Sequence, residues 1–144
     1  MHERNDSEYH QTLVEELVAI FKGRGYRILG ADNVAGIAPP RPLPNDGYGD
    51  QEKKTPDVFA FDKKNKCYVI GEAKTGEGDL ETDHALTQYN VFLDQFDNRE
   101  GTRATLYIIL PANKVPEFNS LITHYIHPDY WKHLVVVTSQ TPPS

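Results

Sequence analysis

The chain has a single cysteine, Cys67, and no long apolar run. One cysteine cannot form an intramolecular disulfide, so we expect Cys67 to pack in a core and the protein to occupy a reducing, intracellular and cytoplasmic setting. Without an apolar stretch of about 18 residues or more, no membrane partner is expected. The sequence also lacks a Gly-x-Ser-x-Gly elbow, a glycine-rich phosphate loop and the histidine spacing of a zinc site. These absences remove support for serine hydrolases, kinases, dinucleotide-binding enzymes and zinc proteins.

Positive charge is scarce in this chain. Fifteen lysines and arginines stand against 21 aspartates and glutamates, which gives a formal net charge of −6. Proteins that bind nucleic acid are usually basic, at least locally, so this balance argues against a broad basic surface. With 144 residues, of which 38% are hydrophobic, the chain is long enough for one domain, residues 1–144, with a substantial core.

Apolar periodicity predicts alternating helices and strands. The expected elements, in order, are a helix at about 7–23, strands at 26–29, 56–61 and 66–73, a helix at 83–98, a strand at 104–110, a helix at 116–125 and a strand at 134–137. Residues 32–54, with four prolines and no periodicity, predict a long loop, and residues 139–144 a polar tail. The order α-β-β-β-α-β-α-β predicts an α/β fold with a mixed central sheet flanked by helices.

Two carboxylates and an amine fall at one end of the predicted hairpin. Asp57 lies about seven residues before the turn centre and Glu72 about eight residues after it, so antiparallel pairing brings them level. Side chains alternate along a strand, so Glu72 and Lys74 share a face while the backbone carbonyl of Ala73 stays available as a further ligand. Such oxygens suit Mg²⁺, and the amine could hold or deprotonate an attacking water, or stabilise developing charge. These are the groups that hydrolysis of a phosphodiester needs.

Pro56-Asp57, followed across a hairpin by Glu72-Ala73-Lys74, resembles the PD-(D/E)XK nuclease superfamily, which includes restriction endonucleases and Holliday-junction resolvases. The element order agrees with the core of that superfamily over about residues 7–110. The resemblance implies a restriction-endonuclease-like core in which Asp57 and Glu72 bind Mg²⁺ or Mn²⁺ and Lys74 assists the attacking water. It further implies a nuclease that acts on nucleic acid, expected to be DNA, and leaves 5′-phosphates.

Further candidates come from the helices and the loop. Many members of the superfamily carry a metal-binding glutamate on the first helix, and Glu16, slightly closer than Glu15 to the apolar face, is the candidate here; the alternative is a solvated helix charge. Gln88 lies where several branches place a glutamine that contacts the site or the DNA backbone, although the tyrosine found four residues later in one branch is missing. Lys53 and Lys54, just before the motif strand, are the best-placed residues for contacts with phosphate.

Three functions stay open on the sequence. The first is a metal-dependent nuclease, and the second is a catalytically silent nuclease-fold binding module or regulatory subunit of a larger nucleic-acid-processing assembly. The third is a metal-dependent hydrolase of a small phosphate ester, with the loop closing a pocket. Against all three stands an ordinary structural role, in which Asp57 caps a strand and Glu72 pairs with Lys74 on a solvated face. A homodimer is common in the superfamily, but nothing in the sequence specifies an interface.

Overall fold

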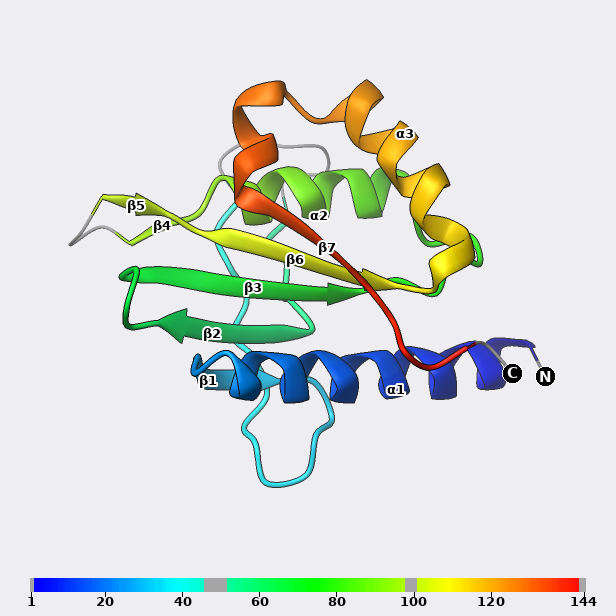
Figure 1. Ribbon diagram of the computed structural model, residues 1–144, viewed down its shortest axis with the longest axis horizontal. Coiled ribbons are helices and arrows are strands. Elements are labelled where there is room, and N and C mark those ends of the chain that lie inside the picture. Colours follow the sequence, from blue (N-terminus) through cyan, green and yellow to red (C-terminus); the bar gives the residue numbers. More distant parts are fainter. Residues whose placement is uncertain (1, 46–51, 98–100, 143–144) are drawn as a thin grey trace.

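Five strands form one mixed sheet with helices on both faces (Figure 1). The computed structural model describes residues 2–45, 52–97 and 101–142. The sheet order is β1-β2-β3-β6-β7. The strands are β1 (Arg27–Ala31), β2 (Val58–Asp62), β3 (Cys67–Ala73), β6 (Thr105–Leu110) and β7 (Leu134–Thr138). The helices are α1 (His2–Gly23), α2 (Asp83–Leu93) and α3 (Val115–Tyr125), with short 3-10 helices η1 (Ala112–Lys114) and η2 (Pro128–His133).

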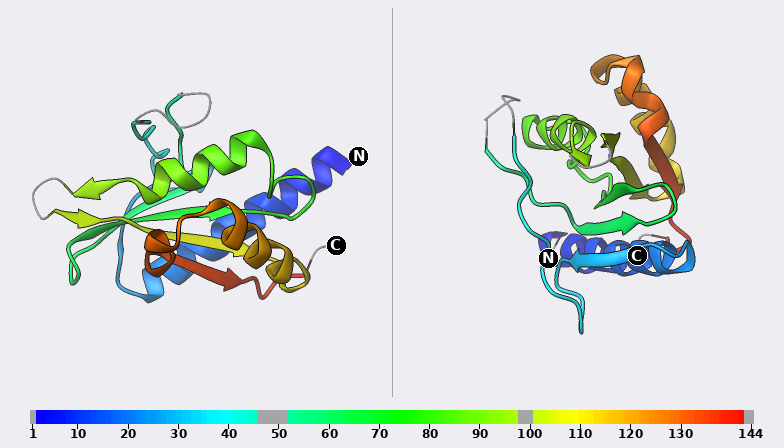
Figure 2. Two further views of the ribbon diagram at one scale, coloured as in Figure 1. Left: turned by 90° about the horizontal axis from the view of Figure 1, so that it is seen from above. Right: turned by 90° about the vertical axis from the view of Figure 1, so that its left-hand side faces the viewer.

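The helix α1 covers one face of the sheet, and α2 and α3 cover the other (Figure 2). Leu13, Leu17 and Phe21 recur every four residues along α1, are fully buried, and pack against Val69 and Ile109 of the sheet. On the opposite face the side chains of α2 and α3 form a second apolar cluster with alternate residues of the same strands. This double coverage explains the near-continuous apolar sequences of β3 and β6.

The strand pairing places the motif as the hairpin prediction requires. The strands β2 and β3 are antiparallel, with Val58 opposite Gly71 and Asp62 opposite Cys67. The strand β3 then pairs in parallel with β6, with Ala73 opposite Ile109, and β6 pairs in parallel with β7. The start of β2, the end of β3 and the N-terminal half of α1 therefore lie at one end of the sheet (Figure 1).

The predicted mixed α/β architecture is confirmed, and two local expectations are corrected. The helix α1 begins at His2, earlier than predicted, and α2 ends at Leu93 instead of continuing to residue 98. Beyond Leu93 the chain forms β4 (Phe96–Asp97), which pairs with β5 (Thr102–Arg103) in a separate two-stranded sheet. Arg103 explains the early end of α2, because its guanidinium binds the Leu93 carbonyl and lies over the Phe96 ring.

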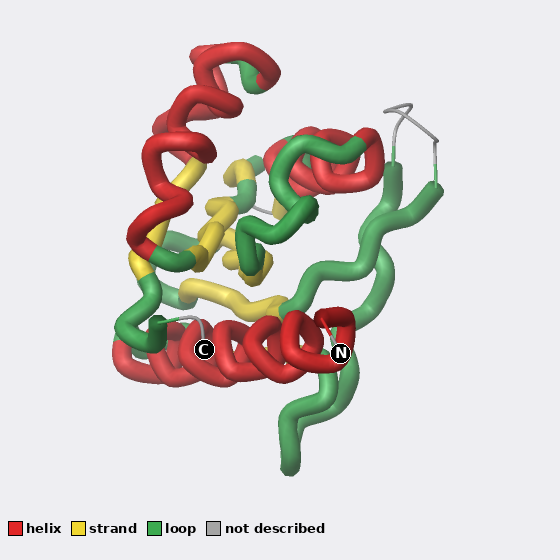
Figure 3. Tube along the Cα trace, turned by 90° about the vertical axis from the view of Figure 1, so that its right-hand side faces the viewer, coloured by secondary structure: helices red, strands yellow, loops and turns green. Residues whose placement is uncertain are grey.

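The predicted loop 32–54 is anchored at several points. Asp32 donates its N–H to the Asp57 carbonyl, and Leu43 and Lys54 form an isolated antiparallel bridge. Two arms of the loop run side by side past the sheet towards α2 (Figure 3), where the Gln95 amide donates to the Pro44 carbonyl at 2.9 Å. Residues 46–51 of this prediction lie outside the described residues, as do residues 143–144 of the predicted tail.

The expectations for the single cysteine and for membrane-spanning segments can be compared with the fold. Cys67 is buried in β3, as expected for a packing residue. Within residues 2–45, 52–97 and 101–142, the structure contains no helix that combines the length and apolar character needed to cross a membrane.

Gly30 allows the loop to approach β1 closely, and we predict that Gly30→Ala destabilises the fold. A Cβ at this position would lie 2.6 Å from Pro40 Cα and 2.9 Å from Pro40 N. These are backbone atoms in a proline pair, so they cannot rotate aside, and the expected loss is about 1–3 kcal/mol in urea unfolding. Gly23→Ala is the matched control, because nothing lies within 4 Å of its added Cβ. Equal unfolding midpoints for the two variants would contradict the close approach.

Candidate active site

Asp57 and Glu72 hold each other through backbone groups. The N–H of Asp57 donates to Glu72 Oε1 at 2.9 Å, and the N–H of Ala73 donates to Asp57 Oδ2, also at 2.9 Å. Both bonds follow from the β2–β3 register, because Val58 lies opposite Gly71 and the next residues along each strand are Asp57 and Glu72. The two predicted carboxylates are therefore brought together at the end of the hairpin.

The carbonyl of Ala73 lies at the place where the ladder ends. Lys74 donates its N–H to Ile109 of β6, so the polar backbone groups of Ala73 point the other way, towards the chain that leads into β2. Continuing the register would pair Ala73 with Pro56. Proline has no N–H, so Pro56 cannot donate to the Ala73 carbonyl. The Pro-Asp dipeptide thus withholds a ladder donor from the oxygen that the sequence suggested as a third ligand.

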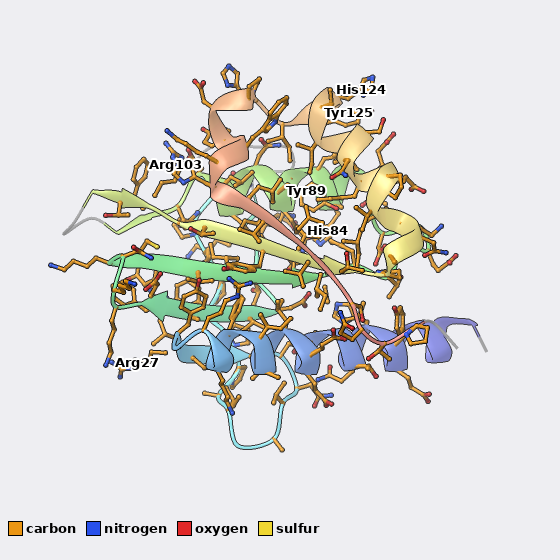
Figure 4. All side chains as sticks on the ribbon, in the orientation of Figure 1. Arg27, His84, Tyr89, Arg103, His124 and Tyr125 are labelled. Atoms are coloured by element: carbon orange, nitrogen blue, oxygen red, sulfur yellow. The ribbon has the colours of Figure 1, made fainter. Side chains whose placement is uncertain are left out.

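Lys74 lies between Glu72 and the helix α2. Its Nζ is 3.5 Å from Glu72 Oε2 and donates to Gln88 Oε1 at 2.9 Å. The ring of Tyr89 lies 5.5 Å from the same nitrogen, and Figure 4 places Tyr89 on α2. The Lys74 side chain is only 7% exposed. Gln88, one of the predicted site residues, therefore contacts the amine of Lys74.

Glu72 is the electrostatically strained group of the site. Its side chain is 3% exposed, and burial together with the negative charge of Asp57 raises its pKa to about 8. Lys74, the Asp57 N–H and His10 oppose this rise but do not cancel it. The raised pKa favours the uncharged form of Glu72, and a cation beside this carboxylate would oppose the rise. This behaviour fits a site that binds a positive ion.

His10 joins the site from α1, and sequence reasoning missed it. Its Nε2 lies 3.2 Å from Asp57 Oδ2, and this hydrogen bond raises the pKa of His10 against the opposing effect of its burial. A signal was present in the sequence, because His10 continues the apolar stripe of Leu13, Val14 and Leu17 at helical spacing. A polar residue on the buried stripe of a helix faces the sheet, where the motif was expected.

Glu16, the predicted acidic ligand from the first helix, is not brought to this cluster. Its carboxylate accepts hydrogen bonds from Ser139 Oγ at 2.7 Å, from the Gln140 N–H at 2.8 Å and from Thr141 Oγ1 at 3.3 Å. Glu16 therefore binds the segment that follows β7 to the helix α1. The position on α1 that meets Asp57 is instead six residues earlier, at His10.

The two lysines predicted to contact phosphate have different surroundings. Lys53 is exposed, whereas Lys54 is buried and its Nζ lies 3.2 Å from His84 Nδ1 on α2. The backbone of Lys54 also forms the bridge with Leu43. As placed, Lys54 packs the loop against α2, so of this pair Lys53 is the one that presents its charge to solvent.

An open depression of about 450 Å³ adjoins the site beside His10. Its charged lining is acidic, from Asp32, Glu77 and Asp79. Asp79 is held in place by the N–H groups of Thr75 and Gly76, at 2.7 and 2.8 Å. Such a lining attracts cations and repels a bare phosphate, so a polyanionic substrate needs a bound cation to approach here.

At this site the described residues offer a divalent cation two carboxylates, those of Asp57 and Glu72. Among them no group of three or more histidine, cysteine, aspartate or glutamate side chains is arranged as a metal site. Mg²⁺ commonly uses one or two protein carboxylates and keeps several waters, so Asp57 and Glu72 with the Ala73 carbonyl match that ion. They do not match zinc, which takes four nitrogen or sulfur ligands in structural sites.

Comparisons of the chain with protein-family models, with curated proteins and with solved structures found no match. The assignment to the PD-(D/E)XK superfamily therefore stays a prediction from the motif and the element order.

We predict that Glu72→Gln stabilises the cation-free protein at pH 8. The folded state holds the Glu72 proton up to about pH 8, whereas an unfolded glutamate loses it near its ordinary pKa of 4.5. The stabilisation from protonated Glu72 is thus complete below about pH 4.5 and is lost as the pH rises to about 8. Glutamine is neutral at every pH and can still accept the Asp57 N–H, so the variant keeps this stabilisation.

Urea unfolding in chelator from pH 5 to 8 measures the effect. The difference in unfolding free energy between Glu72→Gln and the parent should grow in favour of the variant with rising pH. Glu15→Gln removes an exposed carboxylate from α1 and is the control. A constant difference across this range would show that Glu72 is ionised at neutral pH in the folded protein.

Proposed function

We propose that this chain is a metal-dependent nuclease that hydrolyses phosphodiester bonds of nucleic acid, with DNA as the expected polymer and Mg²⁺ or Mn²⁺ as the cofactor. The observation that carries the proposal is the convergence of Asp57, Glu72 and Lys74 at one end of the β2–β3 hairpin. An ordinary surface ion pair would be solvated, whereas Glu72 and Lys74 are both buried. Their burial argues against the purely structural alternative, because burying charged groups is costly and is usually tied to function.

The carboxylates of Asp57 and Glu72 and the carbonyl of Ala73 would hold the cation. When bound, a divalent cation neutralises charge on the phosphate oxygens and lowers the pKa of a water. Glu72 would release its proton on cation binding. His10 would keep its hydrogen bond to Asp57, or lose it when the protonation of the imidazole changes. The chain thus supplies hard oxygen ligands together with two titratable side chains, Glu72 and His10.

Lys74 would act on the attacking water or on the phosphate. Gln88 Oε1 accepts from Nζ at 2.9 Å, which fixes the amine beside Glu72 Oε2. In the hydrolysis the water oxygen bonds to phosphorus, the bond to the ribose oxygen breaks, and that oxygen leaves with a proton. By resemblance to the superfamily the broken bond is to O3′, which leaves a 5′-phosphate. The amine is placed to hold the water or to stabilise the charge that develops on phosphate.

A nuclease-fold binding module without turnover is the second candidate. The small exposed areas of Glu72 and Lys74 favour it, as does the net charge of −6. The open side of the site is formed by Asp57 and His10, whose side chains are 14% and 31% exposed, so a substrate would enter past these two. Cation binding separates the candidates, because a silent module has no need of the cation.

We expect the protein to cleave nucleic acid with Mn²⁺ or Mg²⁺, and Lys74→Ala and Asp57→Asn to lose at least about 100-fold in rate. The assay uses linear, circular, branched and single-stranded DNA together with RNA, each with and without chelator. Lys22→Ala is the matched control, since Lys22 is exposed in the last turn of α1. Cleavage of a chromogenic diester alone would instead indicate a small phosphate ester as substrate, and cleavage of nothing above the chelated background would favour the binding module.

We also expect Mn²⁺ affinity to rise with pH, by up to about tenfold per unit between pH 6 and 8. The reason is that Glu72, with its pKa of about 8, must lose a proton before it can bind the ion. Calorimetry in buffers of different ionisation enthalpy measures both the affinity and the proton released. Glu72→Gln should abolish binding, and Glu15→Gln should leave it unchanged. An affinity that is independent of pH would contradict cation binding at this carboxylate pair.

A further inference from the structure

A second depression, of about 730 Å³, lies at the opposite end of the sheet from Asp57 and Glu72. It is formed by Arg103 of β5 and by the 3-10 helix η2 with its preceding residue His127. Arg103 comes just before β6, whose other end lies beside Ala73. Figure 4 shows Arg103 near the start of β6, on the same side of the sheet as α2. We call this depression the Arg103 pocket.

Arg103 is held rigidly in this pocket. Its guanidinium carbon lies 4.4 Å from the ring centre of Phe96 and 4.8 Å from that of Tyr130. Nη1 donates to the Leu93 carbonyl at 2.9 Å and lies 3.5 Å from Asp94 Oδ1. Within the described part of the chain, the donors on Nε and Nη2 have no hydrogen-bond partner. A guanidinium fixed in advance, with donors to spare, loses little entropy when it binds a phosphate.

Two cationic and two acidic side chains lie in or beside the pocket: Arg103 and Lys132, and Asp94 and Asp129. Lys132 is exposed beside Arg103, and burial followed by the charges of Arg103 and Lys132 lowers the pKa of His133. Of the nearby acids, Asp129 lies 3.6 Å from His127, and Asp94 is paired with Arg103 itself. Among the described residues Lys132 forms no ion pair, and its exposed amine faces solvent beside Asp129, which is also exposed. Unlike the depression beside His10, whose charged lining is acidic, this pocket has Arg103 and Lys132 in its lining.

We propose that the Arg103 pocket binds the sugar–phosphate backbone of a nucleic acid strand at a distance from the cleavage site. The inference rests on the proposed nuclease function, since it assigns a second contact to the same substrate. From Arg103 to Leu110, level with Lys74, the chain advances seven residues. Fully extended, at about 3.3 Å per residue, this stretch spans at most about 23 Å, the length of about seven base-pair steps of a duplex.

The surroundings of the pocket suit a strand with bases. Phe96 is 45% exposed, and one face of its ring already carries the Arg103 guanidinium. Exposed aromatic rings beside arginine commonly stack on bases without regard to sequence. A strand that reaches from the Arg103 pocket to the end of β6 beside Ala73 would be held by Arg103 and Lys132 at one end and by the cation at Asp57 and Glu72 at the other. An acidic chain can thus bind a polyanion through two separate points.

Lys132→Gln tests the proposal, because Lys132 is exposed and the substitution leaves the packing of Arg103 intact. Binding of a fluorescein-labelled DNA of about 20 nucleotides, single-stranded or duplex, is followed in chelator across about 50–200 mM salt. We expect affinity to fall about three- to tenfold and the salt slope to drop by about one. Lys22→Gln removes the same charge from the end of α1 and should match the parent. Equal losses in the two variants, or no loss in either, would overturn the proposal.

Two further readouts keep this proposal separate from the nuclease proposal. The DNA should raise the pKa of His133 in an NMR titration, because a phosphate offsets the charges of Arg103 and Lys132. A pKa of His133 that DNA leaves unchanged would overturn a nucleic-acid site, and so would a pKa that rises with tripolyphosphate but not with DNA. If the parent cleaves DNA while Lys132→Gln keeps the parent's KM and salt slope, the pocket assignment fails and the nuclease stands. If no cleavage occurs but Lys132→Gln loses DNA binding, the pocket stands and the nuclease fails.

Discussion

The mutual clasp of Asp57 and Glu72, in which backbone N–H groups donate to each carboxylate, determines where the other site residues have to lie. Two carboxylates removed from water at the end of a hairpin repel each other, and the fold offsets this repulsion from both faces of the sheet. The helix α2 supplies Gln88, which steadies Lys74, and α1 supplies His10. The part of this repulsion that is not offset raises the pKa of Glu72. This residual repulsion is the physical basis for expecting a cation there.

The distribution of charge bears on the polyanionic substrate that we propose for this acidic chain. Acidic residues surround the end of the sheet where β2 begins and β3 ends. Arg103 and Lys132 lie at the other end. Net charge averages over these two regions and so describes neither. The electrostatic field therefore differs between the two ends of β6. A bound cation would change the sign of the field at the acidic end alone.

The hairpin and its carboxylates could be predicted because the information is local. A polar turn between two apolar runs fixes the register, and the register fixes which side chains meet. The contacts of α1 could not be predicted in the same way, because they depend on how far the helix slides along the sheet; a shift of under two turns exchanges Glu16 for His10. Lys54 is buried by a loop that folds back on α2, and the end of that helix is fixed by Arg103, ten residues beyond Leu93. Neither leaves a periodic signal.

The separations along the chain imply an order of assembly. Asp57 and Glu72 are 15 residues apart, whereas His10 and Asp57 are 47 apart, and Glu16 and Ser139 are 123 apart. Short loops close before long ones, so we expect the hairpin to form while its carboxylates are still hydrated. Water leaves them only when the helices settle on the sheet. From the raised pKa of Glu72 we expect its protonation to favour the late docking of α1 and α2 and to have little influence on the first closure of the hairpin.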